Sequence, residues 1–531
     1  MNAIVEELLA GEKRQTGGAD MMLQLAEWAA ASYARYDRAA VDRIAKAAAE
    51  AACALAGPLA EAAVKETGFG VAEHKKIKNE ICSRGIYDAY RNEDFCSKRV
   101  IAEQKLVEVP RPAGVVFALA PSTNPVCTVY FKILLALMTR NAIIISPHPL
   151  AKKCSAEGAL AMAKAAEQAG APAGIIQVIA EPTLPLIEHV MKSPRVNVIL
   201  ATGGTPVVRA AYSSGNPAIG VGPGNAPAFV DASADLNAAA KRIIGSKCFD
   251  NSILCTNESV VVAEESIADK LLQAMSKAGA YVAKPQEVDD IREYLFGLGS
   301  FNVDVVGKSA PEIAARVGLK VPSSTKVILT PIDRVGIDEA LSKEKLCPVL
   351  GFVRVPHVHA GISTSRALIR MSGAGHSAAI HSATPANILS FAAAVKALRV
   401  VVNAPCSQGA AGFGTHLAPS FTIGTGYFGR SSVGENIGPK HLVNWTRIAY
   451  SDEASETFGD FSALETWSGQ AALPIGREAP MTIGRLQEGA DRADASLFAQ
   501  AGGGAMSDEI ALMREEIRRI VLEELRSAFR K

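Results

Sequence analysis

Four short apolar runs, each followed by a helix-forming stretch, constrain the fold more than any other feature of the sequence. They are Val115–Leu119, Ala142–Ser146, Ile175–Ile179 and Val196–Leu200. Apolar strands that alternate with helices predict a parallel sheet with helices on both faces. The predicted fold class is therefore α/β. Ligands of such sheets bind beyond the carboxyl ends of the strands, so the loops after the strands are the first places to search for a site.

Three of these loops carry residues suited to ligand binding. The loop at residues 201–205 contains two glycines before a predicted helix. Its backbone can therefore approach a phosphate, and the free N–H groups of the helix can bind that phosphate. The loops are Ala120-Pro121-Ser122-Thr123-Asn124-Pro125, Ser146-Pro147-His148-Pro149 and Ala201-Thr202-Gly203-Gly204-Thr205.

Two other glycine-rich segments are predicted to be ordinary loops. Gly424–Gly429 matches the G-x-G-x-x-G pattern, but no alternating strand and helix pattern surrounds it, so we do not predict dinucleotide binding there. Gly220–Asn225 lacks a following helix and is predicted to be a turn between two strands.

A cysteine stands in a loop between a predicted helix and the apolar strand Ser259–Val262. The loop reads Lys247-Cys248-Phe249-Asp250-Asn251-Ser252-Ile253-Leu254-Cys255-Thr256-Asn257. A loop held between rigid elements can expose a cysteine to substrate, and a thiolate is a strong nucleophile. Most free cysteines are small buried apolar residues, which is the alternative for Cys255 and our interpretation of Cys248.

Composition narrows the possible functions. Of 531 residues, 49% are hydrophobic and 21% charged, and the net charge of +1 gives no electrostatic reason to expect nucleic acid or an anionic membrane surface as a partner. We expect no secretory signal at Met1–Glu7 and no membrane span, because no apolar run approaches roughly 18 residues. Nine cysteines without metal-ligand spacing indicate a reducing, cytoplasmic setting with free thiols. His357 and His359 lack a third ligand, so no metal site is predicted.

The sequence suggests six segments. They are an N-terminal helix or arm (1–20), a dinucleotide-binding domain (21–246) with strands near 98–112, a catalytic domain (247–435), an oligomerisation segment (436–467), a flexible linker (468–505) and an amphipathic helix (506–531). The first helix is expected to end near Gly11. The last one carries an apolar stripe that it cannot bury by itself, so we expect it to bind a partner or to fold back on its own oligomer.

The motifs above, in this order, resemble the coenzyme A-acylating branch of the aldehyde dehydrogenase superfamily. The resemblance covers roughly residues 20–465 and includes Phe249-Asp250-Asn251 with Cys255, Glu344-Lys345-Leu346-Cys347-Pro348-Val349 and Gly375-His376. It implies a Rossmann-like parallel-sheet cofactor domain, an α/β catalytic domain and a small β element for oligomerisation.

The resemblance also implies roles for the motif residues. Cys255 would attack an aldehyde, and the Asn124 amide with the Cys255 N–H would hold the oxyanion. Glu344 would bind the nicotinamide ribose of NAD, which is favoured over NADP. The remaining cofactor-binding residues would be Pro121, Ser122, Thr123, Ser146, Pro147, His148, Thr202, Gly203 and Gly204.

One departure separates two enzyme classes. Hydrolytic relatives carry a water-activating glutamate in a Glu-Leu-Gly-Gly segment, whereas the corresponding stretch here, Gly220–Asn225, has no carboxylate. Without this general base, coenzyme A is the expected acyl acceptor, and His376 either assists proton transfer or is a core histidine. The alternatives are a hydrolytic or semialdehyde-type relative and an inactive scaffold.

The helix at 506–531 resembles the peptides that bind cargo enzymes to bacterial microcompartment shells. This implies shell proteins as partners and the microcompartment lumen as location. It favours a short-chain aldehyde as substrate, propionaldehyde before acetaldehyde. The family suggests a homodimer or homotetramer.

Overall fold

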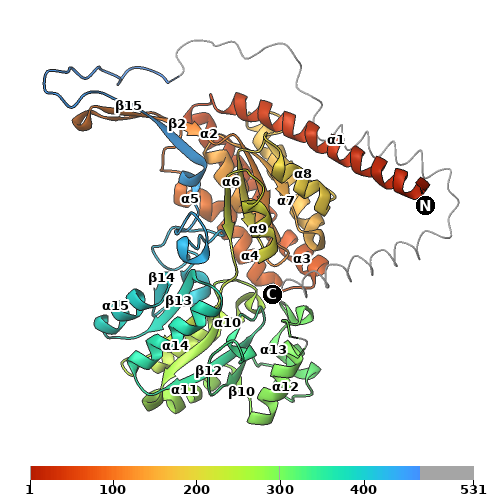
Figure 1. Ribbon diagram of the computed structural model, residues 1–531, viewed down its shortest axis with the longest axis vertical. Helices are drawn as coiled ribbons and strands as arrows, with labels where there is room; N and C mark the ends of the chain where they lie inside the picture. Colours follow the sequence, from red (N-terminus) through yellow and green to blue (C-terminus); the bar gives the residue numbers. More distant parts are fainter. Residues whose placement is uncertain (1, 298, 467–531) are drawn as a thin grey trace.

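The computed structural model describes residues 2–297 and 299–466, and these contain two parallel sheets and one antiparallel sheet. The segments predicted at 468–505 and 506–531 lie outside the described residues. Figure 1 shows the first parallel sheet in the upper half of the molecule and the second in the lower half, with α10 near their junction.

The first sheet has the strand order β5-β4-β3-β6-β7, and every neighbouring pair is parallel. Its strands are β3 (Val115–Leu119), β4 (Ala142–Ser146), β5 (Ile176–Val178), β6 (Val198–Thr202) and β7 (Ala218–Val221). The four predicted runs are thus confirmed as strands, with β6 two residues later than expected. Every residue of β3 and β4 is buried, as expected for strands covered on both faces.

Helices surround this sheet, and all of them except α4 (Ala72–Glu80) contribute apolar residues to its core. They are α1 (Asn2–Tyr33), α2 (Arg38–Ala54), α3 (Ala56–Thr67), α4 (Ala72–Glu80), a π-helical turn (Ile81–Gly85), α5 (Ile86–Tyr90), α6 (Pro125–Met138), α7 (Lys152–Gln168), α8 (Leu184–Lys192) and α9 (Thr205–Tyr212). α6 is buried along its whole length, which its apolar sequence explains.

The expected end of the first helix near Gly11 is wrong. α1 continues through this glycine to Tyr33, and Figure 1 shows it extending beyond the body of the domain. A glycine inside a helix costs about 1 kcal/mol relative to alanine, which weakens a helix without ending it.

The second sheet has seven parallel strands in the order β10-β11-β12-β9-β8-β13-β14. They are β8 (Ala226–Val230), β9 (Glu258–Glu264), β10 (Ala280–Val282), β11 (Val327–Pro331), β12 (Val349–Val355), β13 (Gly375–His381) and β14 (Ala397–Val402). Its helices are α10 (Leu236–Cys248), α11 (Glu265–Lys277), α12 (Pro285–Phe296), α13 (Ala310–Arg316), α14 (Val358–Met371), α15 (Pro385–Ala394) and α16 (Cys406–Gly409). Separate apolar cores pack on its two faces.

The domain boundary expected at residue 246 falls inside α10 and is corrected by the topology. Both β8 and α10 belong to the second sheet and its core, so the chain passes between the sheets near Gly222–Asn225. After β14 the chain returns, because Ile437 and Leu442 are buried in the core of the first sheet.

A three-stranded antiparallel sheet joins chain segments more than 300 residues apart. It consists of β1 (Arg99–Ile101), β2 (Leu106–Pro112) and β15 (Val443–Ala449), in the order β1-β2-β15. Figure 1 shows β2 and β15 extending from the body at the upper left. The two strands expected near 98–112 are therefore present.

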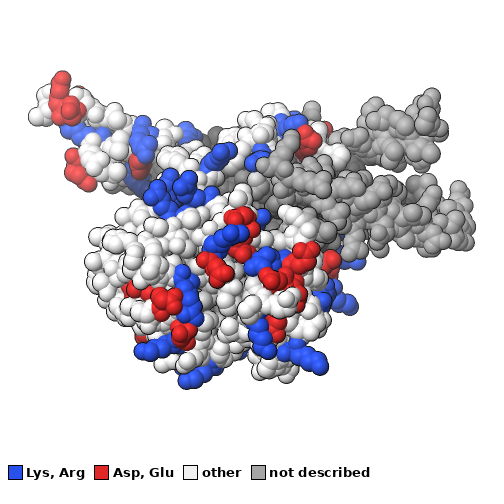
Figure 2. All heavy atoms as spheres, turned by 60° about the horizontal axis from the view of Figure 1, so that its bottom comes forward, with Lys and Arg blue, Asp and Glu red and all other residues white. Residues whose placement is uncertain are grey.

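The surface in Figure 2 carries basic and acidic side chains interspersed with neutral ones, which agrees with the net charge of +1. No single helix within residues 2–297 and 299–466 has the length and apolar character to cross a membrane. α2 and α3 meet these criteria only together, as a pair bent by 58°.

Candidate active site

The three loops selected from the sequence lie next to one another at one edge of the first sheet. They follow β4, β3 and β6, which are adjacent strands, and all three strands end at this edge. After β3 the chain continues to β4, which pairs with one side of β3, whereas the later strand β6 pairs with the other side of β3. The edge is therefore the switch point at which parallel sheets bind ligands.

The loop after β6 leaves open space for a ligand. A side chain added at Gly203 or Gly204 would meet only the neighbouring Val207 or Pro206, at 3.6 Å or more. Gly204 precedes the first turn of α9, whose N–H groups are free to bind an anion. Thr202 Oγ1 lies 3.4 Å from Thr422 Oγ1, which ties this loop to the chain that returns from the second sheet.

The loop after β4 combines a buried and an exposed part. Ser146 is 2% exposed, and its hydroxyl has no hydrogen-bond partner within the described residues. Pro147 is buried, whereas His148 is exposed and its Nδ1 accepts a bond of 3.1 Å from Leu150 N. His148 therefore also caps the following turn.

The remaining candidate residues lie at the amino ends of strands in the second sheet. Gly224, Cys255, Glu344 and His376 stand just before, or at the start of, β8, β9, β12 and β13. These four strands are neighbours, so their amino ends bring the residues to one edge. The site thus joins the carboxyl edge of one sheet to the amino edge of the other. Asn124 makes this link directly, because its Nδ2 donates to Ile253 O at 3.2 Å.

The loop leading to Cys255 has an uncommon backbone. Asp250, Asn251 and Ser252 have φ angles of +48°, +51° and +66°, three successive left-handed residues without a glycine. Such residues cost about 1 kcal/mol or more each and persist only where the surroundings impose them. Here Asn251 Nδ2 donates to Gly307 O at 2.8 Å, and Asn257 Nδ2 donates to Ser252 Oγ at 3.0 Å.

Cys255 is partly buried in a tightly enclosed position. A side chain on Gly224 would place its Cβ 1.9 Å from Cys255 O, so the turn packs directly on the cysteine backbone. Burial, with a further contribution from the Glu344 carboxylate, raises the pKa of Cys255 to about 12. The Cys255 backbone N–H and Arg399 act in the opposite direction.

Glu344 links the turn, the cysteine loop and β12. Its Oε1 accepts a bond of 3.1 Å from Gly224 N. Burial raises the pKa of Glu344 to about 7, and the bond from Gly224 and the buried ammonium groups of Lys247 and Lys345 limit the rise. Glu344 and Cys255 were predicted from separate motifs, and the fold brings them together.

Arg399 is a functional candidate that the sequence did not reveal. It is 3% exposed in β14 and donates to the carbonyl oxygens of His376, Gly375, Gly424 and Gly434. It fixes the glycine-rich run from 409 to 434 against β13, and its cation limits the rise in the pKa of Cys255. No local motif marks it, because its partners come from three distant segments.

The sequence profile of the aldehyde dehydrogenase family matches residues 6–289, which is more than half of the chain. The chain belongs to the aldehyde dehydrogenase family. It is 40% identical to an aldehyde-alcohol dehydrogenase of Clostridium acetobutylicum over 81% of this chain and 50% of that protein. It is 37% identical to a succinate-semialdehyde dehydrogenase (acetylating) of Clostridium kluyveri over 79% of this chain and 93% of that protein. The chain thus spans about half the length of the first curated relatives it matches.

Solved structures agree with this membership. An acetylating aldehyde dehydrogenase from Geobacillus thermoglucosidasius matches with a TM-score of 0.82 and 36% identity, covering 84% of this chain and 99% of that one. A propionaldehyde dehydrogenase from the Clostridium phytofermentans fucose utilisation bacterial microcompartment matches with a TM-score of 0.74, 28% identity and coverage of 82% and 97%. A propionaldehyde dehydrogenase of Rhodopseudomonas palustris with bound coenzyme A and an acylated cysteine gives a TM-score of 0.74, 27% identity and coverage of 81% and 96%.

In this aldehyde dehydrogenase chain, His376 lies inside the protein at the start of β13. It is fully buried, its Nδ1 lies 3.0 Å from Ser377 Oγ, and its Nε2 has no partner within the described residues. Burial, aided by Arg399, lowers the pKa of His376 to about 3, so the ring is neutral at pH 7. No hydrogen bond joins it to Cys255 in the described part of the chain.

Two further motifs, at Gly424–Gly429 and at His357, make local contacts in the structure. The glycine pattern at Gly424–Gly429 follows no strand and opens only a short 3₁₀ turn, and Thr425 packs against Gly375. His357 caps α14 by accepting a bond from Ala360 N at 3.2 Å. Residues 2–297 and 299–466 contain no cluster of three or more potential metal ligands.

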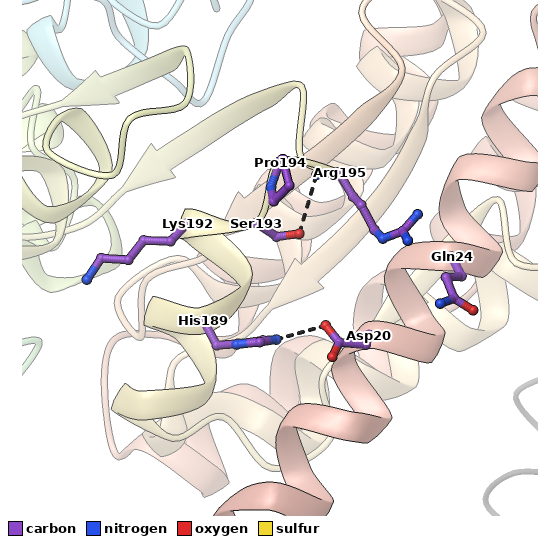
Figure 3. A pocket seen from close by; sticks show the side chains of 7 residues that line it. All are labelled: Asp20, Gln24, His189, Lys192, Ser193, Pro194 and Arg195. Atoms are coloured by element: carbon purple, nitrogen blue, oxygen red, sulfur yellow. Dashed lines mark hydrogen bonds and ion pairs between the residues drawn. The ribbon is translucent and has the colours of Figure 1, made fainter.

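A groove of about 480 Å³ lies elsewhere, between α1, α8 and the segment before β6. This is the amino end of β6, opposite the edge that carries Thr202. Figure 3 shows His189 directed at Asp20, with Nε2 2.9 Å from Oδ1. Lys192 and Arg195 also pair, with Glu188 and Glu27, so the groove offers no free cation to an anionic ligand.

Proposed function

We propose that this chain catalyses the NAD-dependent, coenzyme A-acylating oxidation of a short-chain aldehyde. The supporting observation is the fit between Gly224 and Cys255. The backbone of the turn occupies the space beside the cysteine, and residues 220–225 carry no carboxylate that could activate water. An acyl group on Cys255 is therefore released by a thiol and not by water. The relative with bound coenzyme A and an acylated cysteine supports coenzyme A as this thiol.

The first step uses the proposed oxyanion donors. The Cys255 thiolate sulfur adds to the aldehyde carbon, and the carbonyl oxygen becomes an oxyanion. The Asn124 Nδ2–H and the Cys255 N–H are the proposed donors, and Asn124 Nδ2 lies beside the cysteine loop at Ile253 O. Loss of one such donor usually costs about a hundredfold in rate. A proton must leave the thiol first, and the Arg399 cation favours this because it limits the rise in the pKa of Cys255 that burial causes.

The residues at the carboxyl edge of the first sheet fit a dinucleotide. The open space at Gly203 and Gly204 admits a diphosphate beside α9, and the unpartnered Ser146 hydroxyl can bond a sugar or adenine group. The residues proposed to hold NAD are Pro121, Ser122, Thr123, Ser146, Pro147, His148, Thr202, Gly203, Gly204 and Glu344. Bound NAD supplies the hydride acceptor, and the thiohemiacetal on Cys255 becomes a thioester when the hydride leaves.

The second step releases the acyl group. The coenzyme A sulfur attacks the thioester carbon, the bond to Cys255 Sγ breaks, and acyl-coenzyme A leaves with the cysteine thiolate restored. The coenzyme A thiol must lose its proton, and we assign acceptance of this proton to His376 Nε2. Its unpartnered position supports the assignment, although a pKa of about 3 makes it a weak base in the free protein.

The test is formation of reduced cofactor from propionaldehyde with and without coenzyme A. We expect steady turnover and acyl-coenzyme A, detected by mass spectrometry, only when coenzyme A is present. Equal steady-state turnover without it, with a carboxylic acid as product, would contradict the proposal.

A hydrolytic reaction is the second candidate, and Glu344 is the observation in its favour. It is a carboxylate close to Cys255 with a pKa raised to about 7, as a general base requires. Its bond from Gly224 N occupies Oε1 and argues for a holding role instead. If Glu344→Gln abolishes formation of the carboxylic acid but leaves acyl transfer to coenzyme A, the hydrolytic reaction is supported.

For the substrate we propose propionaldehyde, with acetaldehyde next. The two propionaldehyde dehydrogenases named above support this order, while the acetylating succinate-semialdehyde relative supports a semialdehyde. kcat/KM measured over a series of straight-chain aldehydes and succinate semialdehyde decides among them. A maximum at the semialdehyde would overturn the proposed substrate.

We propose microcompartment shell proteins as partners of residues 506–531. The apolar stripe of this segment and the similar protein from a fucose utilisation microcompartment support the proposal. Deleting residues 506–531 should leave kcat unchanged and abolish co-purification with shell proteins. Continued packaging of the shortened chain would contradict it.

A further inference from the structure

Two buried lysines on α4 join the two loops from which the proposed oxyanion donors come. Lys75 and Lys78 are three residues apart, so they lie on the same face of the helix, and they are 3% and 2% exposed. A buried ammonium group is retained only where it is paired or serves a function. The reaction described above gives neither lysine a role.

Asp250 is the shared partner of both lysines. Its Oδ2 accepts from Lys75 Nζ at 3.2 Å and from Lys78 Nζ, and its Oδ1 accepts from Val71 N at 2.6 Å. Asp250 is fully buried and is the first of the three left-handed residues before Cys255. α4 therefore holds the start of the cysteine loop in its strained conformation.

The same ammonium groups reach the loop after β3. Lys75 Nζ donates to Thr123 O at 3.1 Å, and Lys78 Nζ donates to Asn124 Oδ1 at 2.5 Å. Each lysine thus bonds one group in the first sheet's loop and one in the cysteine loop. The bridge fixes the separation between the Asn124 side chain and the Cys255 backbone.

The bond to Asn124 Oδ1 also determines how this amide is turned. The two ends of an amide are similar in size, and their hydrogen-bond partners decide which end points where. With Oδ1 on the ammonium group of Lys78, Nδ2 is directed at Ile253 O, on the side of the cysteine. A cation on the carbonyl oxygen polarises the amide and makes its N–H groups stronger donors.

We propose that Lys78 is a positioning residue that orients and polarises the Asn124 amide for the oxyanion, while Lys75 and Asp250 hold the two loops together. The proposal rests on the proposed function, which gives Asn124 its oxyanion. Two ammonium groups face one carboxylate in this cluster, and the surplus positive charge favours an anion beside it.

The first experiment compares three methionine variants of α4. Lys78→Met should lower kcat for aldehyde oxidation by about tenfold to a hundredfold and leave the cofactor KM within about twofold. Lys75→Met loses the bonds to Thr123 O and Asp250 Oδ2 but leaves the bond from Lys78 to Asn124 in place, so it should have a smaller effect. Lys76→Met is the control, because this side chain is 56% exposed on the same helix, and it should match the wild type.

A double-mutant cycle separates positioning from simple stabilisation. If Lys78 acts through Asn124, the double variant Lys78→Met/Asn124→Ala should be no slower than Asn124→Ala alone. Multiplied losses would overturn the proposal, as would an unchanged kcat in Lys78→Met. Lys78→Gln keeps an N–H donor without the charge and should lie between Lys78→Met and the wild type, which provides a second test if Lys78→Met does not fold.

Two further measurements keep the outcomes distinct. The alkylation rate of Cys255 by iodoacetamide should be similar in Lys78→Met and the wild type, which shows that the cysteine loop is intact. If the wild type oxidises aldehyde but the rate losses of Lys78→Met and Asn124→Ala multiply in the double variant, this inference alone is refuted. A wild type that forms no acyl-coenzyme A refutes the proposed function, and the inference falls with it.

Discussion

The two parallel sheets contribute to one site from opposite ends and with opposite packing. The first offers the carboxyl ends of β4, β3 and β6, where glycines at 203 and 204 border open space. The second offers the amino ends of β12, β9, β8 and β13, where Gly224 touches the Cys255 backbone. The side suited to a ligand that enters and leaves is open. The side suited to covalent chemistry is fixed by its neighbours.

Removing the proposed nucleophile tests the second side most severely. Cys255→Ala should lower aldehyde oxidation by about 10⁴-fold or more, because no other described group is placed to form the thioester. Formation of reduced cofactor and mass spectrometry of the acylated protein measure it. Cys248→Ala is the matched control, since its Sγ bonds only Gly245 O, and it should retain activity. Comparable activity in both variants would remove Cys255 from the mechanism.

A single methyl group should break the close packing on this side. Gly224→Ala places a Cβ 1.9 Å from Cys255 O, so the turn or the cysteine loop must move. A displacement of this size at the reacting group costs about a hundredfold in kcat. Gly245→Ala adds the same methyl group on the exposed face of α10, with no atom within 4 Å, and should retain full activity. A Gly224→Ala variant with wild-type kcat would show that the packing is irrelevant to the chemistry.

The difference between the sheets also explains what the sequence could predict. The strands of the first sheet and the loops after them follow from local apolar runs, and a neighbouring strand order then brings Ser146, Asn124 and Thr202 to one edge. Cys255 and Glu344 were found from separate motifs. Their meeting at the amino ends of β9 and β12 depends on a seven-strand order that local patterns do not encode.

The residues that escaped prediction are those whose role depends on distant partners. Arg399 bonds carbonyls of three segments, and Lys78 bonds Asn124 and Asp250, which are 46 and 172 residues away. The boundary near residue 246 was misplaced for the same reason. β8 looks like one more apolar strand after the first sheet, and only its pairing with β9 and β13 assigns it to the second.

The charge of Glu344 gives a pH-dependent test of the same region. Burial and the Glu344 carboxylate both raise the pKa of Cys255, to about 12, so the free protein holds a thiol at neutral pH and should alkylate slowly. Glu344→Gln removes the negative charge and can still accept a bond from Gly224 N. Its pH profile for iodoacetamide alkylation should move to lower pH. An unchanged profile would show that burial alone controls the thiol.

The open side should tolerate what the closed side does not, and Gly204→Ala is the direct counterpart of Gly224→Ala. Gly204 has φ −66° and ψ 165°, which any residue adopts, and an added Cβ meets only Pro206 Cδ at 3.7 Å. The thermal midpoint should therefore stay within about 2 °C of the wild type, because surface substitutions usually change stability by less than about 0.5 kcal/mol. The cofactor KM should rise by only a few fold, since the methyl group borders the proposed diphosphate position without blocking the N–H groups of α9. A hundredfold loss of kcat at Gly204, equal to that at Gly224, would remove the distinction between the two sides. An unchanged KM would move the diphosphate away from this loop.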